Sequence, residues 1–176
     1  DVPGATSFMA VDRIGQTVAC AIGLGRPFGL GTAASGTGIF LRPAKDEGPA
    51  SALAVIAGNR NTWQVHLGAT GGGGDVAVSS MLQSILNHYN DDLSVARAIE
   101  SPRLHPDVGG GTLFVEEAMG ANQVSALSGL GVPVTTTAAL GYAALFRCID
   151  GLSKSKADCD LAGDPRGGGL VLFERE

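Results

Sequence analysis

The sequence has few charged and few aromatic side chains for its length. Charged residues make up 16% of its 176 residues, and the aromatic residues are 6 Phe, 2 Tyr and 1 Trp. The formal net charge of −5 argues against nucleic acid as a partner, because nucleic-acid-binding proteins present a basic face to the phosphates. No apolar run approaches the roughly 20 residues of a membrane-spanning helix. Hydrophobic residues still make up 44%, so the composition is that of a globular protein rather than a disordered one.

Glycine, by contrast, is abundant, with 27 residues. Much glycine with few aromatic side chains suits tight turns and close packing of the backbone. One interpretation is that a partner chain completes the core, since few large side chains are available to fill it. The other is a general Gly/Ala-rich composition. The first residue is Asp1 rather than Met, so we expect the chain to derive from a longer one whose targeting signal lies upstream.

The sequence has only 3 cysteines, Cys20, Cys148 and Cys159. Cys20 lies in an apolar run, which predicts a buried thiol. Cys148 and Cys159 flank a mostly polar segment that is typical of a loop, and we predict a disulfide across it, which implies an oxidising compartment. The alternative is a pair of unpaired thiols. No second ligand pair accompanies them, so the spacing fits no zinc motif.

Strand-like and helix-like segments alternate in groups along the chain. The predicted strands are residues 7–11, 16–24, 38–41, 52–57, 63–67, 113–116, 132–137, 142–149 and 169–174. The predicted helices are residues 76–90, 94–100 and 122–130. Strands in adjacent hairpins with helices between them predict an α+β fold, in which helices cover an antiparallel sheet. No internal linker is visible, so we expect a single domain over residues 1–176.

The longest predicted helix has the clearest sequence pattern. Asp75 precedes it as a candidate N-cap. Apolar residues then recur at spacings of three and four: Val78, Met81, Leu82, Ile85 and Tyr89. This periodicity predicts a helix that buries these side chains on one face.

Four segments carry a family resemblance when they are taken in order. They are ATSFMAVD at residues 5–12, GTGIFL at 36–41, four glycines at 71–74 followed by a helix and SPRLH at 101–105, and GDPR at 163–166. In this order and spacing they resemble the small subunit of γ-glutamyltransferases, whose motifs include Ala-Pro-Arg-Phe-His and Asp-Pro-Arg. The resemblance implies the αββα sandwich of N-terminal-nucleophile hydrolases. It also implies a larger partner subunit from the same precursor and a periplasmic or extracellular location.

The resemblance places Ala5 at the position of the catalytic nucleophile. In the family this residue is a threonine exposed by autocleavage, whose own α-amino group serves as the base. A methyl group cannot attack a carbonyl. Thr6 is the next hydroxyl, and it could act if the register slipped by one residue and if its amine became free. Residues 1–4 precede both positions, so neither has a free amine in this chain.

Other positions that the resemblance implies for substrate binding are also changed. A family threonine and asparagine correspond to Gly23 and Gly25, which carry no side-chain hydrogen bonds. The aspartate that holds the substrate amino group corresponds to Glu47, whose extra methylene displaces the charge. The family's serine pair corresponds to Ser51 and Ala52, so half of it is kept.

The glycine-rich turn before the long helix is the best-preserved part of the expected site. Backbone N–H groups of Gly73 and Gly74, with Gly72 as an equal candidate, could form an oxyanion hole. The alternative is a tight strand-to-helix turn without a ligand. His66, His88 and His105 are scattered, and we expect them to be structural or surface residues. We expect no metal site and no cofactor.

Three functions remain open on the sequence. The first is a degenerate member of the family that has lost catalysis and acts as a structural, assembly or binding subunit of a larger complex. The second is an active γ-glutamyl transferase or hydrolase, or a related amidohydrolase acting on glutathione-type substrates, with Thr6 as the nucleophile. The third is a stand-alone secreted domain, which would leave uncovered the face expected to meet the large subunit.

Overall fold

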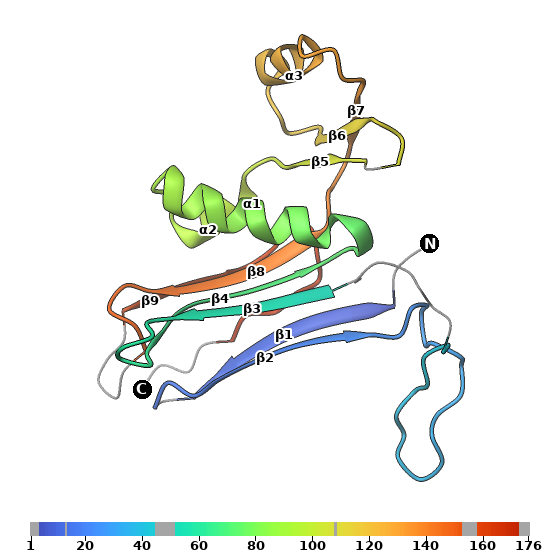
Figure 1. The fold of residues 1–176 in the computed structure, drawn as a ribbon, viewed down its shortest axis with the longest axis vertical. Helices are drawn as coiled ribbons and strands as arrows, with labels where there is room; N and C mark the ends of the chain where they lie inside the picture. Colours follow the sequence, from blue (N-terminus) through green and yellow to red (C-terminus); the bar gives the residue numbers. More distant parts are fainter. Residues whose placement is uncertain (1–3, 13, 45–51, 108, 153–157, 173–176) are drawn as a thin grey trace.

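The computed structural model describes residues 4–12, 14–44, 52–107, 109–152 and 158–172 (Figure 1). Its strands are β1 (Ala5–Val11), β2 (Thr17–Gly23), β3 (Ala52–Gly58), β4 (Val65–Gly72), β5 (Leu104–Pro106), β6 (Leu113–Glu116), β7 (Val134–Thr137), β8 (Tyr142–Cys148) and β9 (Cys159–Gly163). Its helices are α1 (Ala77–Asn90), α2 (Val95–Glu100) and α3 (Ala121–Ser128), with a short 3-10 turn, η1 (Gly74–Val76), leading into α1. The fold therefore mixes helices and sheets, as the sequence predicts.

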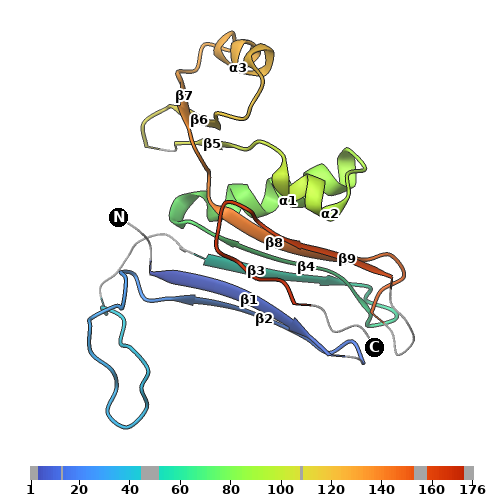
Figure 2. The ribbon, with the colours of Figure 1, turned by 180° about the vertical axis from the view of Figure 1, so that it is seen from behind.

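Three layers form the body of the molecule. The central layer is an antiparallel sheet with the strand order β3-β4-β8-β9. Helices α1 and α2 lie on one face of it, and the antiparallel hairpin β1-β2 packs on the other face, as Figures 1 and 2 show from opposite sides. In the part of the chain that the structure describes, no helix covers the outer face of β1-β2.

A smaller lobe stands beyond the helices (Figure 2). It contains the three-stranded sheet β5-β6-β7 and helix α3, and its β6 and β7 strands run parallel. The chain leaves the body after α2 and returns to it between β7 and β8. This lobe is therefore connected to the body by two chain crossings.

The hydrophobic core lies between the helices and the central sheet. Its buried members are Leu67, Ala69, Met81, Val95, Ile99 and Leu145. Aliphatic side chains fill it, because none of these residues is aromatic. Close approach of the backbones compensates for the small side chains: a Cβ added to Gly71 of β4 would lie 2.7 Å from the carbonyl oxygen of Ala77 in α1. Glycine thus lets α1 pack directly on the sheet.

Helix α1 does not bury the face that its apolar periodicity predicts. Its buried residues are Ala77, Ser80, Met81 and Ser84. Val78, Leu82 and Tyr89 are exposed, so that prediction is wrong for these three side chains. Ala77 and Met81 lie against Gly71 of β4. The hydroxyls of Ser80 and Ser84 bond to the carbonyl oxygen of Leu140 and to the Arg103 guanidinium, so polar contacts bury these two residues. The predicted cap is also wrong, because Asp75 lies within η1 and the N-cap of α1 is Val76.

Two predicted strands are not formed as expected. Residues 38–41 contribute only an isolated bridge between Ala33 and Phe40, within the long loop that follows β2. The described part of 169–174 contains no strand. The fourth strand of the central sheet is instead β9, and β5 was not predicted either. None of the described helices is long and apolar enough to cross a membrane.

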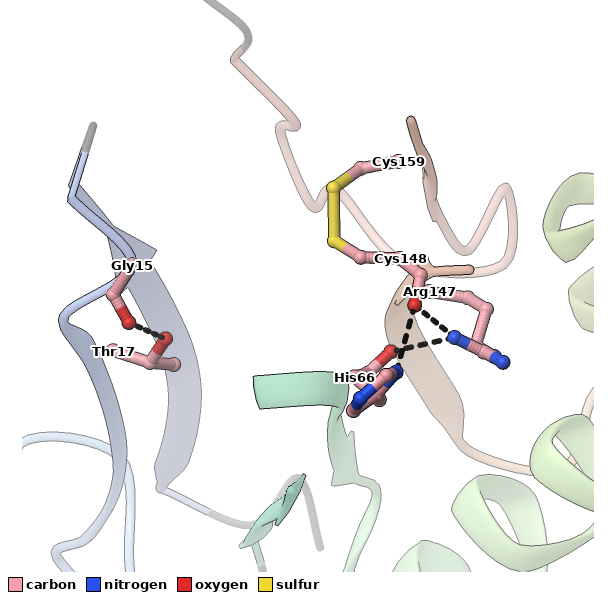
Figure 3. Close-up of a disulfide and its surroundings, with 6 residues drawn as sticks. All are labelled: Gly15, Thr17, His66, Arg147, Cys148 and Cys159. Atoms are coloured by element: carbon pink, nitrogen blue, oxygen red, sulfur yellow. Dashed lines mark hydrogen bonds between the residues drawn. A yellow bond between two sulfur atoms is a disulfide. The ribbon is translucent and has the colours of Figure 1, made fainter. Parts of the chain in front are cut away.

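The predicted disulfide is present at the outer end of the central sheet. Cys148 and Cys159 face each other across β8 and β9 and are bonded (Figure 3). The carbonyl of Cys148 accepts a hydrogen bond from Arg147 and faces Nδ1 of His66 at 3.3 Å. Cys20 is a free thiol, but it is half-buried rather than fully buried. The bridge holds the edge strand β9 in register with β8.

Replacing both bridged cysteines by serine should lower the free energy of unfolding by about 2–4 kcal/mol, because the bridge closes a short loop in the unfolded chain. Chemical denaturation with and without a reducing agent measures this effect. The Cys20→Ser variant is the matched control and should keep the sensitivity to reduction. A wild-type protein whose stability is unchanged by reduction would contradict a stabilising bridge.

Candidate functional site

The first strand divides its side chains between two faces. Ala5, Ser7 and Met9 are half-buried, whereas Thr6 and Phe8 are exposed. Successive side chains of a strand point to opposite faces, so Ala5 and Ser7 face the central sheet and Thr6 faces away from it. Thr6 pairs with Ile22 across the hairpin, and Ile22 is also exposed. The start of β1 thus presents a methyl group and then a serine hydroxyl to the interior.

The glycine-rich end of β4 lies beside the start of β1. The hydroxyl of Ser7 donates to the carbonyl oxygen of Gly71 at 3.3 Å. The hydroxyl of Tyr142, at the start of β8, donates to the carbonyl oxygen of Ala5 at 3.3 Å. A Cβ added to Gly72 would lie 2.2 Å from the Tyr142 ring, so the ring lies against the glycine backbone. Tyr142 therefore bridges the expected nucleophile position and the glycine turn.

The glycine turn itself is packed against another glycine. Gly73 has φ 118° and Gly141 has φ 63°, values in the left-handed region that favours glycine. A Cβ added to Gly73 would lie 2.7 Å from the Cα of Gly141. A Cβ added to Gly141 would lie 2.3 Å from Oγ of Ser80. The turn is thus held by backbone contacts that only glycine permits.

The structure brings together some of the predicted site residues. Ala5 lies beside the end of β4 that leads into Gly73 and Gly74, while Thr6 points to the opposite side of β1. Glu47 and Ser51 lie outside the described residues. The site roles of all of these residues stay predictions. Sequence reasoning missed Ser7 and Tyr142, because the contact between Tyr142 and Ala5 joins residues 137 positions apart.

Gly23 and Gly25 lie next to this region on β2 and just after it. Gly23 pairs directly with Ala5, and a Cβ added to it would meet nothing within 4 Å. Gly25 has φ 77°, a conformation that side chains rarely adopt, although Asn tolerates it better than most. The open space at Gly23 means that packing within the described residues does not require glycine there.

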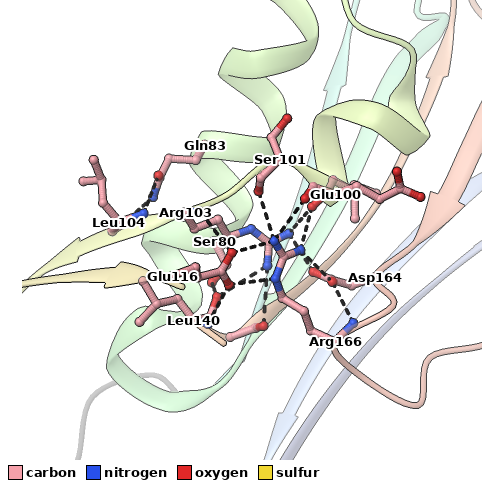
Figure 4. A network of polar contacts seen from close by, with 12 residues as sticks. Ser80, Gln83, Glu100, Ser101, Arg103, Leu104, Glu116, Leu140, Asp164 and Arg166 are labelled. Atoms are coloured by element: carbon pink, nitrogen blue, oxygen red, sulfur yellow. Dashed lines mark hydrogen bonds and ion pairs between the residues drawn. The ribbon is translucent and has the colours of Figure 1, made fainter. Parts of the chain in front are cut away.

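The two arginine-containing motifs meet in one buried ion network (Figure 4). Asp164 pairs with Arg103 at 2.6 Å and with Arg166 at 3.1 Å. Glu116, at the end of β6, pairs with Arg166 at 2.6 Å. The side chains of Arg103, Glu116 and Asp164 are at most 2% exposed. Two positive and two negative charges thus neutralise one another within the protein.

The same four side chains hold backbone groups of several segments. Glu116 accepts hydrogen bonds from the backbone N–H of Arg103 at 3.0 Å and of Leu140 at 2.8 Å. Asp164 accepts one from the N–H of Ala143 at 2.9 Å. These bonds tie both chain crossings of the lobe to the body. We therefore assign the arginines of the two motifs a structural role in positioning the lobe.

Burial and ion pairing act in opposite directions on the two arginines. Burial lowers the pKa of Arg103, and the neighbouring Asp164 opposes this effect. Burial also acts to lower the pKa of Arg166, but its hydrogen bonds to Glu116 and Asp164 outweigh burial and raise it. Nε of Arg103 is the buried side-chain atom without a hydrogen-bond partner among the described residues. Burial therefore dominates at Arg103, whereas the bonds to carboxylates dominate at Arg166.

The three histidines make local hydrogen bonds at separate places. His66 faces the Cys148 carbonyl, His88 the carbonyl of Leu93 at 2.6 Å, and His105 the hydroxyl of Ser79 at 2.8 Å. These contacts agree with structural roles. No group of three His, Cys, Asp or Glu residues gathers to hold a metal ion in the described ranges.

Residues 45–172 match the γ-glutamyltranspeptidase family model. The matched segment is well over half of the chain. The chain belongs to the γ-glutamyltranspeptidase family. No curated protein sequence matches it significantly.

Solved structures support the same fold. A threonine-to-alanine mutant of the Helicobacter pylori γ-glutamyltranspeptidase has 19% identity and a TM-score of 0.75, over 92% of this chain and 100% of the matched chain. The Pseudomonas nitroreducens γ-glutamyltranspeptidase complexed with L-DON has 20% identity and a TM-score of 0.76, over 97% and 100%. The Bacillus anthracis transpeptidase CapD has 20% identity and a TM-score of 0.71, over 96% and 99%. At these identities the likeness establishes the fold of this chain rather than its activity.

The Gly73→Ala substitution should destabilise the protein by about 1–3 kcal/mol, because alanine must adopt a left-handed conformation against the Cα of Gly141. Gly168→Ala is the matched control, since a Cβ at Gly168 meets nothing within 4 Å and should leave stability unchanged. Urea denaturation of both variants compares the two positions. Equal stability of both variants would show that the backbone contact does not constrain the turn.

The Glu116→Gln substitution should cost about 3 kcal/mol or more, because it leaves two buried guanidinium groups with one carboxylate. Arg97→Ala is the control. It breaks an ion pair with Glu100 whose side chains are 76% and 51% exposed, and it should change stability by less than about 1 kcal/mol. The measurement is the free energy of unfolding in denaturant. A smaller loss for Glu116→Gln than for Arg97→Ala would refute the central role of the network.

Proposed function

We propose that this chain is the small subunit of a γ-glutamyltranspeptidase-type assembly that has lost catalysis and serves as a structural, assembly or binding subunit. The observation that carries the proposal is the start of β1. There Ala5 lies beside the glycine-rich end of β4, at the position where the resemblance expects a threonine nucleophile. A methyl group offers neither a nucleophile nor a proton to transfer.

The surroundings of Ala5 support the same proposal. Thr6 is exposed on the opposite side of β1. The register of β1 would have to shift by one residue to bring its side chain to the glycine turn. Ser7 faces the glycine turn, but its hydroxyl donates to the carbonyl oxygen of Gly71, which is not a group that can take its proton. The facing position on β2 is Gly23, which adds no polar group.

The proposed partner is a larger subunit from the same precursor. The outer face of β1-β2 carries exposed apolar residues, including Phe8, Val18 and Ile22. An apolar sheet face of this kind requires a covering layer. A helical layer from the partner would complete the αββα sandwich. A periplasmic or extracellular location agrees with the disulfide, which persists in oxidising compartments.

The alternative is an active γ-glutamyl transferase or hydrolase that uses Thr6. Membership of the family favours it, because the matched relatives are named as transpeptidases. It requires a cut directly before Thr6, so that the amine becomes free, and a change of the first residues of β1 that turns the hydroxyl towards Gly73 and Gly74. Glu47 and Ser51 would then remain candidate substrate-binding residues.

The purified, intact assembly should not release the aniline from a γ-glutamyl anilide above the rate of a buffer control. Thr6→Ala should leave any residual rate unchanged, because Thr6 faces away from the glycine turn. N-terminal sequencing of the same sample tests for a cut before Thr6. Turnover that Thr6→Ala abolishes, together with Thr6 as the N-terminal residue, would replace this proposal by the alternative.

A further inference from the structure

The edge strand β9 is held at its two ends by different chemistry. At one end, the bridge between Cys148 and Cys159 joins the first residue of β9 to the last residue of β8 (Figure 3). At the other end, Asp164 directly follows the strand and takes part in the buried ion network. Among the described strands, β8 is the neighbour of β9 in the sheet. The bridge is therefore a covalent hold on the end of β9 that lies away from the ion network.

Asp160 connects the bridged end of β9 to helix α2. Its carboxylate accepts a hydrogen bond from the N–H of Val95, the first residue of α2, at 2.9 Å. Val95 is fully buried, so its N–H depends on a partner within the protein. Asp160 directly follows Cys159, so the position of this carboxylate depends on where the bridge holds the strand.

A second hydrogen bond lies on the outer side of the bridge. The N–H of Ile149 donates to the carbonyl oxygen of Asp158 at 3.2 Å. The end of an edge strand opens easily, because few neighbouring contacts have to break with it. Without the covalent bond, the hydrogen bonds of Ile149 and Asp160 lie at such an end. The N–H of Ala143, which donates to Asp164 at 2.9 Å, lies at the anchored end instead.

We propose that the Cys148–Cys159 bridge is a redox-controlled latch. Its reduction to two thiols releases the first residues of β9 and, through Asp160, the start of α2, while the Asp164 end of the strand stays closed. Oxidation closes the latch again. The open and closed states correspond to reducing and oxidising compartments, so a chain that is exported from a reducing compartment closes the latch after it has crossed.

The co-reactant that opens the latch is a dithiol. Cys148 is 1% exposed, whereas Cys159 is half-buried on the edge strand, so an external thiolate approaches the sulfur of Cys159. Its attack breaks the S–S bond, forms a mixed disulfide with Cys159 and releases Cys148 as a thiolate, which takes up a proton. The second thiol of the reductant then attacks its own sulfur in the mixed disulfide and releases Cys159 as a thiol. The bridge gains two electrons, and the dithiol loses them and becomes a disulfide.

The latch does not depend on the proposed function. Strand β8 runs from Tyr142, whose hydroxyl donates to the carbonyl oxygen of Ala5, to Cys148. Six residue steps at roughly 3.3 Å each place these two ends about 20 Å apart. The latch therefore opens and closes in the same way whether or not the Ala5 end is catalytic, and either proposal can fail without the other.

Residue-resolved amide hydrogen exchange of the purified assembly, with and without dithiothreitol, tests the latch. We expect reduction to raise the exchange rates of the Val95 and Ile149 N–H groups by about tenfold or more, because each loses the hydrogen bond that protects it. The Ala143 N–H should keep its rate, and reoxidation should restore the other two. Unchanged rates at Val95 or at Ile149 would overturn the proposal, as would an equal rise at Ala143, which indicates general unfolding.

Cysteine variants separate the latch from other effects of the reductant. The Cys148→Ser/Cys159→Ser double variant should exchange like the reduced wild type, with and without the dithiol. Cys20→Ser is the matched control, because Cys20 is a free thiol, and it should respond to the dithiol as the wild type does. A double variant that still responds to the dithiol would trace the effect to another group and overturn the proposal.

The Asp160→Ala variant tests the connection between the bridge and α2. In the bridged protein it should raise the exchange rate at Val95 as far as reduction does in the wild type, because both remove the same acceptor. Reduction of this variant should then leave the rate at Val95 unchanged. A further rise of about tenfold at Val95 on reduction would show that the bridge acts on α2 by another route, which contradicts the role of Asp160.

Discussion

The packing of the lobe against the body depends on the buried ion network of Arg103, Glu116, Asp164 and Arg166. A buried charge without a partner costs several kcal/mol, so each side chain constrains the segment that carries the next one. The network joins the end of α2, the end of β6, the chain before β8 and the end of β9. The two arginine-containing motifs lie far apart in the sequence, and the network brings them together in the folded chain (Figure 4). The charged side chains of the two motifs and of Glu116 neutralise one another.

Glycine supplies the second constraint, through close contacts between backbones. Gly71 allows α1 to approach β4, Gly72 lies against Tyr142, and Gly73 meets Gly141. These contacts replace the large side chains that the composition lacks. They also place the glycine turn next to the start of β1. Gly72 and Gly73, two of the glycines that were expected to form an oxyanion hole, are thus required by the packing itself.

The sequence predicted the parts of the fold that local patterns determine. Apolar segments on either side of short turns located the hairpins β1-β2 and β3-β4, and the polar segment between Cys148 and Cys159 located the disulfide. The buried face of α1 was predicted wrongly, because periodicity reports where apolar side chains lie and not which face meets a glycine-rich strand. Strand β9 was missed because its sequence, CDLAG, is short and contains Asp160, whose carboxylate binds the N–H of Val95 at the start of α2. At the site, Tyr142 could not be found, since its contact with Ala5 is made only by the folded chain.

The two ends of the sandwich differ in a way that bears on what the chain can do. At one end, the inward-facing groups of the described residues are a methyl, a hydroxyl that is already bonded, glycine backbones and a tyrosine that bridges them. The hydroxyls of Ser7 and Tyr142 both donate to backbone carbonyl oxygens, so hydrogen bonds and glycine packing hold this end together. At the other end, the large apolar side chains of Ile14, Trp63 and Ile149 are exposed, which costs solvation free energy unless something covers them. The exposed apolar face of β1-β2 needs no catalytic residue, so a chain without a nucleophile can still use it to meet a covering layer.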